Sequence, residues 1–226
     1  LDFEVESWNV DGVSHVWVKV PELTAETIIY ALWGKAGVDV PECTTNGAVW
    51  SEGFAAVWHM EQVAASDVSA NGYNATVAGG SVASVKGVVG AGNSFNAGYL
   101  TTGSPVNTAA GTISLWFKSE SVGSGQKAIF ATGNTVYDSK PHTLLVRNGA
   151  NLQSYAPSSY MTVMSIVAQR WYHVALVRDT GVEYIYVDGK YIKSRTCPTV
   201  GNNQNIYLGS GYSANFQGEI DEFRVS

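Results

Sequence analysis

The feature that most limits the fold of this chain is a series of eight short β-rich runs after residue 90, whose first residues lie 13 to 28 positions apart. The runs contain Val, Ile, Tyr and Phe, and Gly, Asn, Ser and Asp separate them, as is typical of strands joined by tight turns. They cover 93–102, 111–120, 127–134, 142–149, 170–179, 183–192, 205–211 and 219–226. The pattern predicts an all-β sandwich or barrel.

Dipeptides that favour hairpin turns predict how several of these runs pair. Asp188-Gly189 lies between two alternating segments, Asn148-Gly149 has the same setting, and 179–181 separates two further runs. We therefore expect an antiparallel meander from about residue 143 to residue 193. Helical periodicity is weak, and only 160–168 is ambiguous between strand and helix.

Composition narrows the classes of protein that the chain can belong to. With 226 residues, 45% hydrophobic and 14% charged, it can bury one large core. A net charge of −6 argues against nucleic acid and anionic membranes as partners. The sequence has no run of 18 apolar residues, so we expect no membrane insertion.

The N-terminal region differs from the rest in its density of tryptophan. Five of the seven Trp precede residue 59. Alternating or β-rich runs predict strands at 13–21, 26–34 and 54–61, whereas 63–80 is a polar sequence of small residues typical of a loop. We divide the chain into a partial β unit at 1–48 and a main domain at 49–226. Cys43 and Cys197 can form a disulfide in an oxidising compartment, but the sequence does not decide this.

The order of motifs after residue 49 resembles that of laminin G-like, concanavalin A-type jelly-roll domains. The resemblance implies a two-sheet antiparallel jelly-roll β-sandwich, here with a small N-terminal β appendage. Residues 1–50 resemble the second half of a bacterial domain of unknown function that often precedes such jelly rolls. The motifs of the jelly roll are AVWHM (56–60), DVSANGYNAT (67–76), KGVVGAGNSFNAGYL (86–100), GTISLWFKSE (111–120), RWYHVALVRD (170–179), YIYVDGKYI (184–192), NIYLGS (205–210) and FQGEIDEFRVS (216–226).

A structural calcium ion is the cofactor that this resemblance implies. In the family, the loop that corresponds to 67–74 often joins an acidic residue of the last strand to hold one Ca²⁺, and oxygen-rich loops suit that ion. The candidate ligands are Asp67, Asn71, Asn74 and Asp221. The alternative is an ordinary turn in which the Asp side chain binds its own backbone.

Catalysis is the less favoured interpretation of the C-terminal acids. Glu219 and Asp221 alternate along one predicted strand, as the paired acids of related β-glucanases do, but Glu222 is expected on the opposite face. The sequence has no GxSxG elbow and no metal-binding His pair. We expect His59 and His173 to be core or sheet-face residues.

Aromatic side chains outside the family pattern are the candidates for sugar binding. Sugar rings stack on exposed aromatic faces, and nearby polar groups bind their hydroxyls. Three loop-like stretches, 133–142, 153–161 and 210–216, carry such residues, and Arg147 can bind an acidic glycan. The candidate ligand-binding residues are Tyr137, His142, Arg147, Tyr155, Tyr160 and Tyr212. Those expected to pack internally are Trp116, Trp171, Phe95, Tyr99, Tyr172, Tyr207 and Phe223.

These observations lead us to expect a non-catalytic, lectin-like module of a larger secreted or surface-displayed bacterial protein. Its partners would be a polysaccharide or other glycan and the neighbouring domains of the same polypeptide. One alternative is a structural or protein-adhesion module without a glycan site. A weaker alternative is a glycoside hydrolase or polysaccharide lyase, because folds of this type host many functions.

Overall fold

The computed structural model describes residues 1–134, 142–156, 159–197, 204–211 and 214–226. In these residues the chain forms strands and turns, with short 3₁₀ helices at Glu42–Thr44 and Ala48–Trp50. None of the helices described here has the length and apolar character needed to cross a membrane. The prediction of an all-β fold is confirmed.

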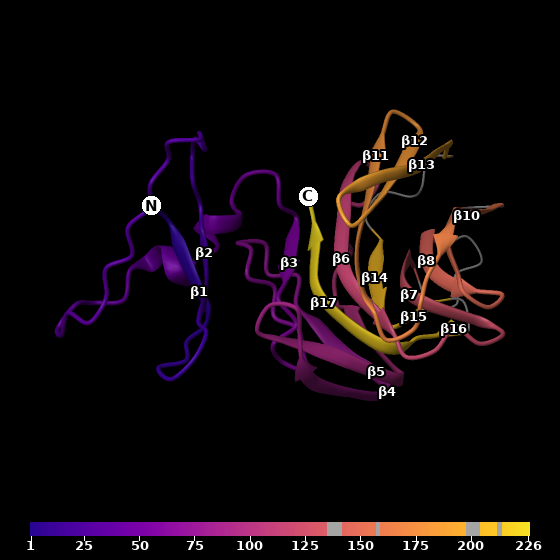
Figure 1. Cartoon of the computed structure of the whole chain (residues 1–226), viewed down its shortest axis with the longest axis horizontal. Coiled ribbons are helices and arrows are strands. Elements are labelled where there is room, and N and C mark those ends of the chain that lie inside the picture. Colours follow the sequence, from indigo (N-terminus) through magenta and orange to yellow (C-terminus); the bar gives the residue numbers. More distant parts are fainter. Residues whose placement is uncertain (135–141, 157–158, 198–203, 212–213) are drawn as a thin grey trace.

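Most strands form one continuous antiparallel path that curves back on itself, as in a jelly-roll β-sandwich (Figure 1). The two end strands of the path contact each other. At the edges, β3 (Ala56–Trp58) pairs with β17, and β4 (Ala75–Lys86) pairs with β5. The order is β10 (Ser159–Ser165), β9 (Asn151–Ala156), β8 (His142–Arg147), β7 (Gln126–Gly133), β14 (Asn205–Leu208), β5 (Ala91–Thr102), β17 (Gln217–Val225), β6 (Gly111–Ser119), β11 (Trp171–Asp179), β12 (Val182–Val187) and β13 (Lys190–Thr196).

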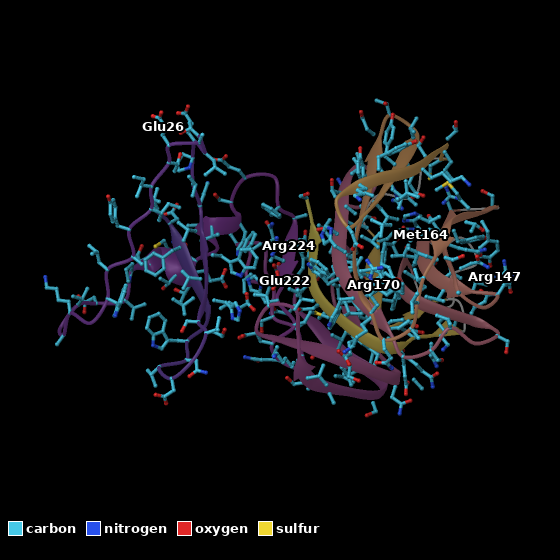
Figure 2. All side chains as sticks on the ribbon, viewed as in Figure 1. Glu26, Arg147, Met164, Arg170, Glu222 and Arg224 are labelled. Atoms are coloured by element: carbon cyan, nitrogen blue, oxygen red, sulfur yellow. The ribbon has the colours of Figure 1, made fainter. Side chains whose placement is uncertain are left out.

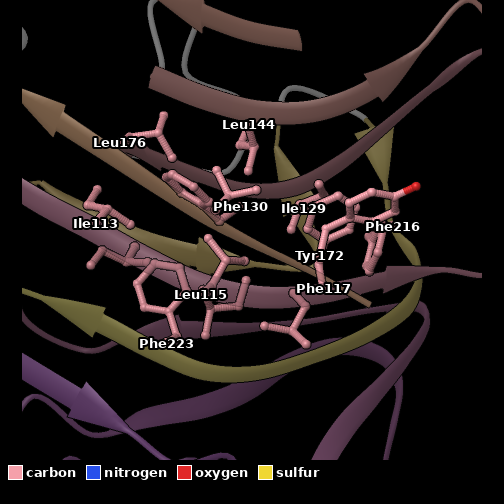
Figure 3. Close-up of a cluster of buried hydrophobic side chains, with 14 of the residues drawn as sticks. Ile113, Leu115, Phe117, Ile129, Phe130, Leu144, Tyr172, Leu176, Phe216 and Phe223 are labelled. Atoms are coloured by element: carbon pink, nitrogen blue, oxygen red, sulfur yellow. The ribbon is translucent and has the colours of Figure 1, made fainter. Parts of the chain in front are cut away.

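The core lies between the two layers of this curved sheet. Alternate residues of β6 and β11 are buried, so Leu115, Phe117 and Val174 point inward while their neighbours point outward. Phe130 and Leu144 meet them from the opposite layer (Figure 3). Two short strands, β15 (Ser210–Gly211) and β16 (Ala214–Asn215), contact the outer side of β7.

The predicted hairpin turns are present where the dipeptides place them. Asp188 and Gly189 both have positive φ, at 50° and 74°, and join β12 to β13. Asn148 and Gly149 do the same between β8 and β9, with φ of 51° and 87°. Two adjacent positive φ values match the right-handed twist of the flanking strands. The ambiguous segment at 160–168 is mainly strand β10.

Two sequence-based assignments were wrong. The run 26–34 is not a strand, and its apolar side chains, such as Leu32 at 95% exposure, are not covered by any described part of the chain. A β-rich run needs a neighbouring strand to satisfy its backbone, and this one has none among the described residues. The loop predicted at 63–80 ends early, because β4 begins at Ala75. This edge strand is largely exposed, so it does not need the apolar alternation that marks a buried strand.

A separate hairpin precedes the sandwich. Its strands β1 (Phe3–Ser7) and β2 (His15–Val18) lie beside β3 and β17, with the N-terminus at the end of the molecule away from β10 (Figure 1). Cys43 is partly buried and Cys197 is buried, and both thiols are free.

Candidate functional site

Three of the predicted ligand-binding residues come together on neighbouring strands. Tyr155 of β9 and Tyr160 of β10 are directly opposite each other in the strand register, and their ring centroids lie 4.7 Å apart. The guanidinium carbon of Arg147, at the end of β8, lies 4.0 Å from the centroid of the Tyr160 ring. We call these three residues the tyrosine platform.

The tyrosine platform lies on the outward face of its sheet. Leu152 and Met161, which alternate with the tyrosines along β9 and β10, belong to the core. Tyr160 is 40% exposed and Tyr155 is partly buried. Figure 2 shows Arg147 at one end of the molecule. The arrangement offers partly exposed aromatic surface beside a cation, which suits a sugar ring that carries hydroxyl or acidic groups.

The other predicted ligand-binding residues do not join this surface. His142 is completely buried in β8, and its Nε2 atom contacts the Glu183 carboxylate. A glycan on the outside of the sandwich cannot reach it, so the expectation of an accessible loop histidine was wrong. Tyr137 and Tyr212 lie outside the described residues.

His142 belongs to a buried polar cluster that superficially resembles a catalytic triad. Ser154 Oγ lies 2.7 Å from Glu183 Oε1 and 3.4 Å from His142 Nε2. In a triad the two ring nitrogens serve different partners, whereas here Nε2 faces both groups and Nδ1 has no hydrogen-bond partner. Arg178 and Arg195 balance the Glu183 charge. The cluster joins strands of both layers and is best explained as structural.

A polar pocket of about 280 Å³ opens between β5, β6 and β17. Lys118 and Glu219 form an ion pair of 2.7 Å on its wall, and Lys118 Nζ also lies 5.1 Å from the centroid of the Trp171 ring. Asn96 and Gln169 add amide groups. The sequence does not reveal this pocket, because its residues come from four distant segments of the chain.

Two tryptophans that we expected to pack internally lie outside the core. Trp116 and Trp171 are only partly buried and occupy the outward positions of β6 and β11. The ring of Trp116 packs against His173, with centroids 5.2 Å apart. Tyr99 is also only partly buried, whereas the expectation was correct for the buried aromatics Phe95, Tyr172, Tyr207 and Phe223.

The proposed calcium ligands do not form a cation site. Each carboxylate oxygen of Asp67 accepts two hydrogen bonds: Oδ1 from the backbone N–H groups of Val57 and Ser69, and Oδ2 from the Tyr73 N–H and the Ser69 hydroxyl. Asn74 accepts a bond from the Asp67 N–H, and the Asn71 amide donates to backbone carbonyls. Donor hydrogens therefore point to the lone pairs that calcium would need, and the residues do not fit this ion.

Asp221 binds a different turn from that of Asp67. Its Oδ2 accepts the N–H groups of Val88 and Val89 at 2.7 and 3.1 Å, and its Oδ1 accepts that of Glu222. Burial raises the pKa of Asp221 to about 7, although the hydrogen bonds from these N–H groups oppose the shift. This carboxylate therefore serves the turn at 87–90 rather than the loop at 67–74.

The strand that carries Asp221 contains a β-bulge that changes the direction of Glu222. The register shifts between Asp221 and Arg224, and Glu222 has a φ of 50°. Phe223 consequently faces the core, while Glu222 Oε1 lies 2.8 Å from His59 Nδ1. We expected Glu222 on the face opposite to Glu219 and Asp221. That expectation assumed strict alternation along the strand, which does not allow for a bulge.

His59 and Glu222 lie at the centre of a buried charged cluster between the N-terminal hairpin and the sandwich. Glu4 and Glu6 reach His59 from β1, at 3.6 and 3.7 Å, and Arg224 pairs with Glu222. Figure 2 shows Glu222 and Arg224 on the side of the sandwich that faces the hairpin. We call Glu4, Glu6, His59, Glu222 and Arg224 the seam cluster.

Burial and neighbouring charges perturb the seam cluster strongly. Burial lowers the pKa of His59, but its contacts with Glu222 and Glu4 outweigh this and raise it to about 9. Burial and the nearby Glu222 carboxylate raise the pKa of Glu6 to about 7. Among the residues that the structure describes, Glu6, His59 and Glu222 form a group whose ligand atoms lie within 4.8 Å of one another, close enough to hold a metal.

Residues 91–226 match the sequence pattern of the concanavalin A-like lectin/glucanases superfamily. The chain belongs to this family. The match covers more than half of the chain and begins at β5, and β3 and β4 join the same sheet from outside the matched region. A search of curated proteins finds no significant match.

Solved structures of low sequence identity share the fold. Domain 4 of AbnA, a GH43 extracellular arabinanase from Geobacillus stearothermophilus solved with arabinotriose, aligns with a TM-score of 0.64 and 23% identity over 76% of this chain and 91% of that domain. The botulinum neurotoxin serotype D binding domain aligns with a TM-score of 0.56 and 16% identity, over 76% of this chain and 48% of that chain. Trypanosoma rangeli sialidase aligns with a TM-score of 0.60 and 14% identity, over 82% of this chain and 32% of that chain.

Proposed function

We propose that this chain is a non-catalytic carbohydrate-binding module that holds a polysaccharide on the tyrosine platform. The observation that carries the proposal is the pair of tyrosines on the outward sheet face, with Arg147 beside Tyr160. Such rings stack on the apolar faces of sugars, and the guanidinium can bind hydroxyl or carboxylate groups. The likeness to an arabinanase domain solved with arabinotriose supports a glycan as the ligand.

The environment of the C-terminal acids supports a binding role rather than hydrolysis. Retaining and inverting glycosidases need two carboxyl groups that face a sugar across open space. Asp221 and Glu222 are both buried, and their oxygens contact backbone N–H groups, His59 and Arg224. Glu219 is the more accessible acid, and it is paired with Lys118. The proposed setting is an extracellular protein in which the module keeps neighbouring domains close to a polysaccharide.

Affinity gels and a glycan array with plant and algal polysaccharides test the proposal. We expect retention by at least one glycan, and a loss of about tenfold in affinity for Tyr155→Ala and Tyr160→Ala, because aromatic anchors carry much of the energy of such contacts. Tyr191→Ala is the matched control, since Tyr191 is 54% exposed on β13 and outside the platform.

The remaining outcomes of this experiment contradict the proposal in different ways. Loss of binding only in Lys118→Ala or Asn96→Ala would place the glycan in the polar pocket instead. A folded protein that no glycan retains would favour a structural or protein-adhesion module. Release of reducing sugar by the purified chain would contradict a non-catalytic role.

A further inference from the structure

The seam cluster contains buried ligand atoms that the protein itself does not satisfy. Glu6 Oε1 and His59 Nε2 are both inaccessible to solvent and have no hydrogen-bond partner, although Nε2 lies 3.6 Å from Glu4 Oε2. The side chains of Glu6 and His59 are 1% and 5% exposed. A buried carboxylate oxygen without a partner costs on the order of 1–3 kcal/mol, and a bound cation at this position would remove that cost.

The space in front of Glu6 Oε1 is bounded by a second carboxylate and by a glycine. A Cβ atom built on Gly90 would lie 2.6 Å from Glu6 Oε1 and 3.0 Å from Glu61 Oε1. The two oxygens therefore approach the same small volume, which Gly90 leaves open because it has no side chain.

The charge around this space is strongly negative. Glu6 and Glu61 border it, and Glu4 and Glu222 lie against the neighbouring His59, whereas His59 and Arg224 are the cations that contact Glu4, Glu6 and Glu222 in the described part of the cluster. Like charges at such distances repel each other unless a cation lies between them. A divalent ion would offset this excess.

The geometry points to a binding site for a divalent cation of the zinc class, held by Glu6, His59 and Glu222. One ligand atom from each of the three side chains lies within 4.8 Å of the others, a spacing that ligands sharing one ion at 2.0–2.2 Å can adopt, and that bond length is typical of zinc. Zinc would take the place of the proton between His59 Nδ1 and Glu222 Oε1. An imidazole nitrogen beside carboxylates suits Zn²⁺ better than Ca²⁺, which prefers oxygen alone.

Aromatic and charged residues around these ligands hold them in place. The indole N–H of Trp17 donates to Glu6 Oε2 at 2.5 Å, and the Trp17 ring stacks on His59 with centroids 5.6 Å apart. The indole N–H of Trp50 donates to Glu4 at 2.6 Å. Such outer contacts orient metal ligands and exclude water. Because Glu6 belongs to the hairpin whereas His59 and Glu222 belong to the sandwich, the ion would stabilise the contact between the hairpin and the sandwich.

Calorimetric titration of the EDTA-treated, dialysed full chain with ZnCl₂ tests the inference, together with thermal melting. We expect saturable binding of one ion per chain and a melting temperature that rises by several degrees as zinc binds the folded state, whereas CaCl₂ has little effect. Glu6→Gln and His59→Gln should weaken zinc binding roughly tenfold or more. Glu52→Gln and His173→Gln, which alter an exposed carboxylate and a sheet-face histidine, should leave it unchanged.

Two results would overturn the inference. One is the absence of saturable zinc binding by the folded wild-type chain, which would make the seam cluster a set of ion pairs around protonated His59. The other is unchanged zinc binding in the ligand variants. If His59→Gln does not fold, Glu6→Gln decides, because its amide oxygen still accepts the Trp17 N–H and preserves that contact.

Discussion

Glu222 combines an unfavourable backbone conformation with favourable side-chain contacts that depend on it. A positive φ costs a non-glycine residue on the order of 1–2 kcal/mol, and Glu222 adopts one at 50°. In return its carboxylate contacts His59 and Arg224, and Phe223 enters the core. The strain is retained because two sets of favourable contacts depend on the bulge.

The raised pKa of His59 predicts how stability depends on pH. The folded state holds the His59 proton up to about pH 9, whereas the unfolded chain releases it near 6.5. The contribution of the His59 proton to the free energy of unfolding is therefore complete below pH 6.5. As the pH rises to about 9, this contribution is lost, which lowers the free energy of unfolding by on the order of 3 kcal/mol. Urea unfolding in EDTA should show this fall, and His59→Gln should flatten it. A wild-type stability that rises over this range would contradict the assignment.

At the scale of elements, the edge hairpin of β4 and β5 depends on close backbone contact. Gly80 has a φ of 60°, and a Cβ atom there would lie 2.1 Å from the carbonyl oxygen of Ala97. Gly189, in the turn between β12 and β13, has a similar φ of 74° but no atom within 4 Å of such a Cβ. Comparing the two positions therefore distinguishes the cost of a left-handed backbone conformation from the cost of a steric clash.

Alanine at these two glycines should therefore have unequal effects. Gly189→Ala should lower the free energy of unfolding by about 1 kcal/mol, the cost of the left-handed conformation alone. Gly80→Ala should lower it by a further ~2 kcal/mol, because the backbone of β4 or β5 must move. Urea denaturation measures both, and equal losses would show that β4 shifts without cost.

The elements also show which parts of the fold the sequence predicts. The turns at Asp188-Gly189 and Asn148-Gly149 are local, because the residues that need a positive φ are adjacent, and both were predicted. Glu6, His59 and Glu222 meet only through tertiary packing and a bulge that alternation does not reveal. Tyr155 and Tyr160 were proposed as loop residues, yet strand register brings them together.

For the whole molecule, the hairpin and the tyrosine platform lie at opposite ends of the longest axis (Figures 1 and 2). Trp17 connects the hairpin to the sandwich: its ring stacks on His59 and lies 4.4 Å from the guanidinium carbon of Arg224. A substitution at Trp17 should therefore weaken the attachment of the hairpin to the sandwich without altering the tyrosine platform.

Trp17→Ala should increase proteolysis within residues 1–50 severalfold while the sandwich stays intact, because the hairpin loses the ring that stacks on His59 and lies over Arg224. Limited proteolysis followed by mass spectrometry measures this. Trp33→Ala is the matched control, since Trp33 is 77% exposed. Equal cleavage of the two variants would mean that other contacts hold the hairpin, and loss of glycan binding in Trp17→Ala would mean that the ends are coupled.

The most direct test of carbohydrate binding is NMR chemical-shift mapping of the full chain with a glycan that it retains. We predict that the largest changes fall on Arg147, Tyr155, Tyr160 and their strand neighbours, and that the seam cluster is unaffected. Changes confined to the polar pocket or the hairpin, or no changes with any glycan, would contradict the account.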